Sequence, residues 1–229
     1  MRILAFASQK GGSGKTTLAG HVAVEAERRG AGPVALVDTD PQGSLAEWWN
    51  AREAETPVYV RTSIGALAED IRRLEAMGIK LLVIDTPPAI TPTIAEVMRV
   101  ADLVVIPAKP SPHDLRAVGA TVTLVERCNK PMVFVVSDAT HRARITSEAV
   151  MALSQHGTVA PSIIGHRIDY AASMIDGRTV MELDEDGKSA LEITRLWQYL
   201  DGRLNGRERE SMLTVSVSAA AVGADAGMI

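Results

Sequence analysis

The sequence predicts an α/β protein in which a doubly wound, mostly parallel sheet carries helices on both faces. Short apolar runs alternate along the chain with amphipathic stretches of helical length, which is the pattern of parallel strands joined by crossover helices. Aromatic residues make up only 3% of the 229 residues, whereas hydrophobic residues make up 46%. The core must therefore consist mainly of aliphatic side chains, as in a sheet buried on both faces, and this length suits one domain.

The predicted strands are the short apolar runs, taken in chain order. The first run, residues 2–7, leads directly into a glycine-rich loop. Proline has no N–H to donate to a neighbouring strand, so the run 158–164, which Pro161 interrupts, can form only an edge strand. The other strands are expected at 33–38, 58–61, 80–85, 102–108 and 131–137.

The predicted helices are the amphipathic stretches between these strands. The last helix, at about 188–204, repeats large apolar residues on one face, and such a stripe is more typical of core packing than of a partner surface. The stripe consists of Ile193, Leu196, Trp197, Leu200 and Leu204. The earlier helices are expected at roughly 16–29, 44–54, 64–77, 92–99, 113–128 and 144–156.

The chain changes in composition after this helix. From Asn205 onward it is polar and rich in small residues. Segments of this kind cannot bury enough apolar surface to fold. We therefore expect one domain over residues 1–204 and a disordered tail over residues 205–229, with a short partner-binding peptide in the tail as the alternative.

Composition also limits the partners. The net charge of −4 and the isoelectric point of about 5.8 give no overall attraction to nucleic acid or anionic lipid, so any such binding must be local. The single cysteine, Cys128, cannot form an internal disulfide or a cysteine-rich metal site. No run approaches the ~18 apolar residues of a membrane span. We expect a cytoplasmic protein.

The motif "KGGSGKTT", residues 10–17, follows a strand and opens a helix. Its glycines let backbone N–H groups and the helix N-terminus approach a phosphate chain. Lys15 then suits the β- and γ-phosphates, and the Thr16 hydroxyl suits Mg²⁺. The predicted nucleotide-binding residues are Lys10, Gly11, Gly12, Ser13, Gly14, Lys15, Thr16 and Thr17.

Acidic residues follow two other predicted strands. Asp38 and Asp40 lie in "VDTDPQGS", and Asp85 ends the apolar run of "LLVIDTPP". The carboxyl ends of parallel strands line the ligand crevice, where a carboxylate can hold a metal-bound water or orient an attacking one. Capping of the next helix is the alternative for the pair Asp38 and Asp40.

These three stretches resemble the deviant Walker A, A′ and Walker B motifs of the ParA/MinD ATPases, P-loop NTPases with an additional signature lysine. The likeness covers about residues 1–204. "VIPAKPSPHDLRAVG" and "IDYAASMIDGRTVMELDEDG" are most similar to the small ParA proteins of the ParF type. The resemblance implies a slow ATPase that uses ATP and Mg²⁺, forms ATP-dependent homodimers and binds nucleoid DNA without sequence preference. It also implies a ParB-like or adaptor protein that stimulates hydrolysis.

The resemblance assigns roles to individual residues. Asp40 matches the carboxylate that activates the attacking water, and Asp38 and Asp85 match the outer-shell groups around a Mg²⁺ held by Thr16. Lys10 matches the signature lysine, which reaches across a face-to-face dimer to the partner's phosphates. The expected catalytic residues are Lys10, Lys15 and Asp40. A lysine at an arbitrary exposed position is more often only solvated.

The predicted DNA contacts are four arginines: Arg142, Arg144, Arg167 and Arg178. Arg167 is the best match to an arginine that related ParA proteins use on the phosphate backbone. Asp169, Asp176 and Glu148 dilute the positive charge nearby. A solvated surface is the alternative for all four arginines.

Other functions of this class are less consistent with the sequence. A MinD-like membrane switch would need a basic amphipathic helix at the C-terminus, and residues 211–229 contain no Lys or Arg. A metal-cluster carrier would need paired cysteines. Plasmid or chromosome partition is therefore the main expectation, and positioning of a carboxysome or a chemoreceptor cluster is the alternative.

Overall fold

The computed structural model of the chain describes residues 1–89 and 91–206, so the predicted tail from residue 207 lies outside it. The strands are β1 (Arg2–Phe6), β2 (Val34–Asp38), β3 (Val58–Tyr59), β4 (Leu81–Asp85), β5 (Leu103–Ala108) and β6 (Met132–Val136). The helices are α1 (Lys15–Arg28), α2 (Ser44–Asn50), α3 (Leu67–Ala76), α4 (Pro92–Val100), α5 (Pro112–Arg127), α6 (Arg144–Ser154), α7 (Ile168–Met174), α8 (Val180–Leu183) and α9 (Lys188–Leu204). A 3₁₀ turn, η1 (Ile64–Ala66), precedes α3.

The strands form one sheet in the order β3-β2-β4-β1-β5-β6, and all five pairings are parallel. The chain enters near the middle of the sheet at β1 and builds outward on both sides. The predicted doubly wound parallel sheet is thereby confirmed. Asp38 and Asp85 lie opposite each other in the register of β2 and β4, so both carboxylates reach the carboxyl edge of the sheet.

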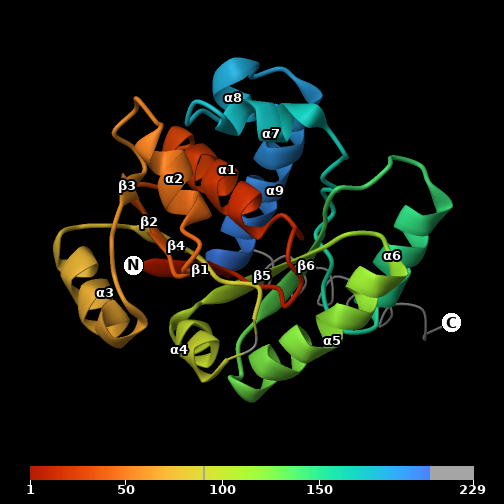
Figure 1. Cartoon of the computed structure of the whole chain (residues 1–229), viewed down its shortest axis with the longest axis horizontal. Helices are drawn as coiled ribbons and strands as arrows, with labels where there is room; N and C mark the ends of the chain where they lie inside the picture. Colours follow the sequence, from red (N-terminus) through yellow and green to blue (C-terminus); the bar gives the residue numbers. More distant parts are fainter. Residues whose placement is uncertain (90, 207–229) are drawn as a thin grey trace, which may run out of the picture.

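Helices cover both faces of the sheet (Figure 1). Successive side chains of a strand point to opposite faces, and β1 follows this rule. Leu4 and Phe6 pack in one core cluster with side chains of α1 and α9, whereas Ile3 and Ala5 pack in a second cluster with side chains of α4 and α5. Each face therefore has its own apolar core, as the aliphatic composition predicts.

Buried polar contacts fix α1, the helix that follows the glycine-rich loop. Thr194 of α9 donates to the buried Glu25 carboxylate at 2.7 Å. His21 donates through Nδ1 to the Thr17 carbonyl oxygen at 2.8 Å, and its Nε2 lies 3.3 Å from Ser173 Oγ of α7. Burial lowers the pKa of His21 to about 4, so the ring is neutral at pH 7. α1 is thus held by two neighbouring helices, α7 and α9.

The structure corrects three expectations. The run 158–164 is not an edge strand, because only isolated bridges from Val159 and Gly165 join that side of β6. The helix expected at 44–54 ends at Asn50, and the one expected at 64–77 begins as a 3₁₀ turn. Helices α7 and α8 were not predicted. No helix in the described part of the chain is long and apolar enough to cross a membrane.

Candidate nucleotide site

The glycine-rich loop joins β1 to α1 at the carboxyl edge of the sheet. Gly12 has φ of 69° and Gly14, the N-cap of α1, has φ of 96°, a left-handed conformation that favours glycine. No side chain caps the N-terminus of α1. Backbone N–H groups at this end of the helix are therefore available to an anion.

Lys15 begins α1 and is buried beneath the loop. Its Nζ donates to the Lys10 carbonyl oxygen at 3.4 Å, so the loop closes around the ammonium group. Burial lowers the pKa of Lys15, and the nearby Asp85 and Asp40 carboxylates oppose this shift. The ammonium lies between these carboxylates and the loop, where the phosphate chain of a nucleotide would be received.

Thr16 and Asp85 form the part of the site that suits a cation. The Thr16 hydroxyl donates to Asp85 Oδ2 at 2.5 Å, across the space between α1 and the end of β4. Burial raises the pKa of Asp85 to about 7, although the hydrogen bond from Thr16 opposes the shift. Hydroxyl and carboxylate oxygens are the ligands that Mg²⁺ prefers, so the atoms present fit this metal.

Asp38 lies opposite Asp85 and also stabilises the loop and the first turn of the helix that follow it. Its carboxylate accepts hydrogen bonds from the backbone N–H groups of Asp40 and Leu45, at 2.9 and 3.0 Å. Burial raises the pKa of Asp38, and these backbone hydrogen bonds oppose the shift. Asp38 therefore makes the contacts expected of a residue that caps the next helix. It also lies opposite Asp85 in the register of β2 and β4.

Asp40 and Lys10 lie at the mouth of the site. Asp40 is half-buried, and its carboxylate accepts a hydrogen bond from the Gln42 backbone N–H at 3.0 Å. The Lys10 side chain is exposed. Deeper in the loop, the buried Ser13 hydroxyl oxygen has no hydrogen-bond partner among the described residues. A buried hydroxyl without a partner is costly, and a bound phosphate would supply one.

A cavity of about 440 Å³ continues from the loop on the side of β6. We call it the base cavity, and its walls are Gly12, Ser13, Gly14, Thr17, Leu18, Lys109, Ser137, Asp138, Ile164, Gly165, His166, Arg167, Ile168, Tyr170 and Ala171. Ser137 Oγ donates to the Ser13 carbonyl oxygen at 2.8 Å, which attaches the loop to the end of β6. The cavity adjoins the phosphate loop, as the base and ribose of a nucleotide require.

Three ionisable side chains meet in the wall of the base cavity. Lys109 Nζ lies 2.7 Å from Asp138 Oδ2, and His166 Nδ1 contacts the other carboxylate oxygen. Burial raises the pKa of Asp138, but the hydrogen bonds with Lys109 and His166 hold it below its usual value. This wall was not predicted from the sequence. The ends of β5 and β6 were the available signal, since ligands gather at the carboxyl ends of parallel strands.

The four predicted DNA-contacting arginines do not form one surface. Arg144 pairs with Glu148 at 2.7 Å, and Arg178 pairs with Asp176 at 2.6 Å. Arg167 pairs with the buried Glu192 at 2.7 Å. Their charges are therefore partly neutralised within the chain, as the nearby acidic residues suggested.

Arg142 and Arg167 do share a surface, a groove of about 910 Å³ between α9 and the loops after β6. We call it the basic groove, and it is lined by His141, Arg142, Pro161, Ser162, Ile163, Arg167, Lys188, Leu191, Glu192 and Arg195. Within residues 1–89 and 91–206, Arg142, Lys188 and Arg195 make no ion pair. Lys188 and Arg195 were not predicted from the sequence; they lie about two helical turns apart on the exposed side of α9.

Comparisons with known proteins agree with this arrangement. A family model described as the CobQ/CobB/MinD/ParA nucleotide binding domain matches residues 4–192. The chain is 30% identical over 198 residues to maintenance of carboxysome distribution protein A from Halothiobacillus neapolitanus, covering 82% of this chain and 91% of the relative. A protein of the same name from Gloeobacter kilaueensis is 40% identical over 126 residues, covering 53% and 55% of the two chains.

The fold is shared with solved structures at lower identity. MinD from Pyrococcus horikoshii in complex with Mg-ADP superposes with a TM-score of 0.72 at 15% identity, covering 87% of this chain and 96% of that one. This likeness concerns the fold alone.

Proposed function

The chain belongs to the CobQ/CobB/MinD/ParA nucleotide-binding family, and from this we propose that it is an ATP-driven switch that positions a large non-DNA cargo. Its membership of the ParA/MinD ATPases rests on residues 4–192. One observation carries the cargo class: a relative named for carboxysome distribution aligns over 91% of its own length. This favours the alternative of the sequence analysis over plasmid partition.

The residues at the glycine-rich loop and at the carboxyl edge of the sheet support the proposal of ATP binding with Mg²⁺. The α1 N-terminus and Lys15 would hold the phosphates, and the base cavity would take the base and ribose. Thr16 would hold Mg²⁺ directly, with Asp85 and Asp38 acting through water. The metal would supply positive charge that neutralises the phosphates. Asp40, at the mouth of the site, would orient the attacking water.

Dimerisation would complete the site. Lys10 is exposed at the loop, and only its backbone carbonyl oxygen contacts Lys15. A second cation arriving from a partner copy would stabilise charge on the phosphoryl group during transfer, as an arginine finger does. Hydrolysis would then await dimer formation and would be accelerated by an adaptor on the cargo.

The surface on which cargo would move is DNA, bound without sequence preference. The basic groove presents Arg142, Lys188 and Arg195, which make no ion pair within the described residues. Phosphate contacts of this kind read no base sequence. A nucleoid-associated switch of this type would release DNA after hydrolysis.

Deleting the gene in its native host tests the cargo. We expect protein-shelled bodies or similar large assemblies to cluster while plasmids remain stably inherited, because only the positioning machinery is lost. Fluorescence microscopy of labelled assemblies and plasmid-loss counts would measure both. Restoring the wild-type gene should restore even spacing, and restoring the Asp40→Ala variant should not. Plasmid loss with evenly spaced assemblies would contradict the proposed cargo and support partition.

A further inference from the structure

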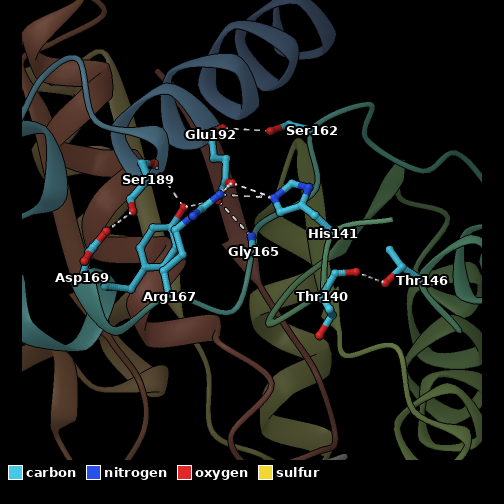
Figure 2. A network of polar contacts seen from close by, with 10 residues as sticks. Thr140, His141, Thr146, Ser162, Gly165, Arg167, Asp169, Ser189 and Glu192 are labelled. Atoms are coloured by element: carbon cyan, nitrogen blue, oxygen red, sulfur yellow. Dashed lines mark hydrogen bonds and ion pairs between the residues drawn. The ribbon is translucent and has the colours of Figure 1, made fainter. Parts of the chain in front are cut away.

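Glu192, in the second turn of α9, joins segments that are far apart in sequence (Figure 2). Its Oε1 accepts hydrogen bonds from Arg167 Nη2 at 2.7 Å and lies 3.0 Å from His141 Nε2. Its Oε2 accepts from the Gly165 backbone N–H at 2.9 Å and from the Tyr170 hydroxyl at 2.8 Å. One carboxylate thus holds two loops and one helix.

The Glu192 carboxylate is ionised although the residue is only 7% exposed. Burial raises its pKa, but hydrogen bonds from Arg167, the Gly165 N–H, His141 and Tyr170 bring it below the usual value. A buried charge is tolerated only when it is fully paired. Removing the charge would therefore change the arrangement of its partners.

Three of these partners line the base cavity, namely Gly165, Arg167 and Tyr170, whereas Glu192 does not. Glu192 therefore supports the cavity wall from behind. The packing there is close: a side chain added at Gly165 would lie 3.0 Å from His141 Nε2 and 3.2 Å from Arg167 Nε. A shift of any one partner would alter the shape of the cavity.

We infer that Glu192 is a positioning residue for the nucleotide base, acting through Gly165, Arg167 and Tyr170. This inference rests on the proposed ATP site. The phosphate end of that site has supports that do not include Glu192, namely β1, α1 and the hydrogen bond from Ser137 to Ser13. Loss of the Glu192 charge should therefore weaken contacts to the base and leave contacts to the phosphates unchanged.

Two ligands separate these effects: Mg-ATP, and Mg-tripolyphosphate, which has no base or ribose. Isothermal titration calorimetry of purified full-length Glu192→Gln should give an ATP affinity lower by roughly tenfold, since several hydrogen bonds to the wall are weakened. Tripolyphosphate affinity should stay within about twofold of the wild-type value. The matched control is Glu185→Gln, which makes the same charge change at an exposed ion pair with Arg28 and should change neither affinity.

A second variant keeps the inference testable if Glu192→Gln fails to fold. Tyr170→Phe removes only the hydroxyl that donates to Glu192 and should lower ATP affinity by roughly threefold with tripolyphosphate unaffected. Equal loss of both ligands, or unchanged ATP affinity in both folded variants, would overturn the inference. A wild-type protein that binds ATP no more tightly than tripolyphosphate would also overturn it. A wild-type protein that binds neither ligand would instead contradict the proposed function.

Discussion

Lys10 and Lys15 are five positions apart and have opposite environments. Lys15 is buried and closed in by the loop, whereas the Lys10 side chain is exposed. Lys15 is therefore placed to meet a phosphate held by its own loop, whereas the Lys10 side chain faces solvent in a single copy. The proposed catalytic part of Lys10 therefore depends on a partner copy.

Mixing two inactive variants tests this dependence. Lys10→Ala and Asp40→Ala should each bind ATP, and each alone should hydrolyse it roughly 10²–10⁴-fold more slowly, the loss typical of removing one catalytic group. In a mixed dimer one site keeps its own Asp40 and receives Lys10 from the partner, so phosphate release should recover. Sizing with ATP and Mg²⁺ confirms that dimers form. A mixture that stays inactive although heterodimers form would place Lys10 in its own subunit's site.

The residues that meet at the glycine-rich loop and the carboxyl edge of the sheet could be singled out because each belongs to a short local pattern. "KGGSGKTT" is recognisable from eight consecutive residues, and Asp38 and Asp85 each end an apolar run. Tyr170 and Glu192 could not be found in this way, because their contacts join segments 22 residues apart. Pairing of Arg167 with Glu192 likewise depends on how α9 packs, which no local pattern reveals.

At the scale of elements, α9 was predicted with its bounds, the seven-residue α2 was predicted too long, and the short helices α7 and α8 were missed. α9 matches the predicted range because its apolar stripe repeats over several turns. α7 has seven residues and α8 has four, too few for a period to be recognised. α7 contributes Ile168, Tyr170 and Ala171 to the wall of the base cavity. Val180 and Met181 of α8 pack in the core cluster that contains side chains of α1.

The turn between α7 and α8 is held against the end of α2, and Gly177 makes this possible. It has φ of +79°, and an added Cβ would lie 2.3 Å from Arg52 Cα. Gly78 has φ of +88° with nothing within 4 Å of an added Cβ. An alanine would be strained by the positive φ at either position, but only at Gly177 would its Cβ also clash with a neighbouring backbone.

Gly177→Ala should therefore destabilise the fold more than Gly78→Ala. Strain alone at Gly78 should reduce the free energy of unfolding by roughly 1 kcal/mol. The added clash with Arg52 backbone at Gly177 should raise the loss to roughly 3 kcal/mol. Urea unfolding followed by circular dichroism measures both. Equal losses would mean that the α7–α8 turn moves freely away from α2.

At the scale of the whole molecule, the fold class followed from the alternation of apolar runs with stretches of helical length. The basic groove did not follow, because its cations come from α9 and from the loops after β6. The net charge of −4 hides such a local concentration. Only the folded chain places Lys188 and Arg195 beside Arg142.

Salt dependence of DNA binding tests the groove. For the ATP-bound protein, affinity for DNA of unrelated sequences should be similar and should fall steeply with salt, because phosphate contacts release counterions. Arg195→Ala should make the negative slope of log affinity against log salt shallower by about 1. Arg144→Ala, which lies outside the groove and pairs with Glu148, should leave the slope unchanged. Fluorescence anisotropy measures both variants. The reverse ranking would move the DNA contact to α6.

Both edges of the sheet are poorly suited to pairing with a strand from another chain. At one side β3 has only two residues, and at the other the segment around Val159 and Gly165 lies along β6 without forming a full ladder. Long exposed edges are templates for pairing between chains, and short or covered edges prevent it. Copies of this chain can therefore be concentrated on one surface without joining edge to edge into aggregates. The proposed function, in which many copies would bind the same DNA, would require tolerance of that kind of crowding.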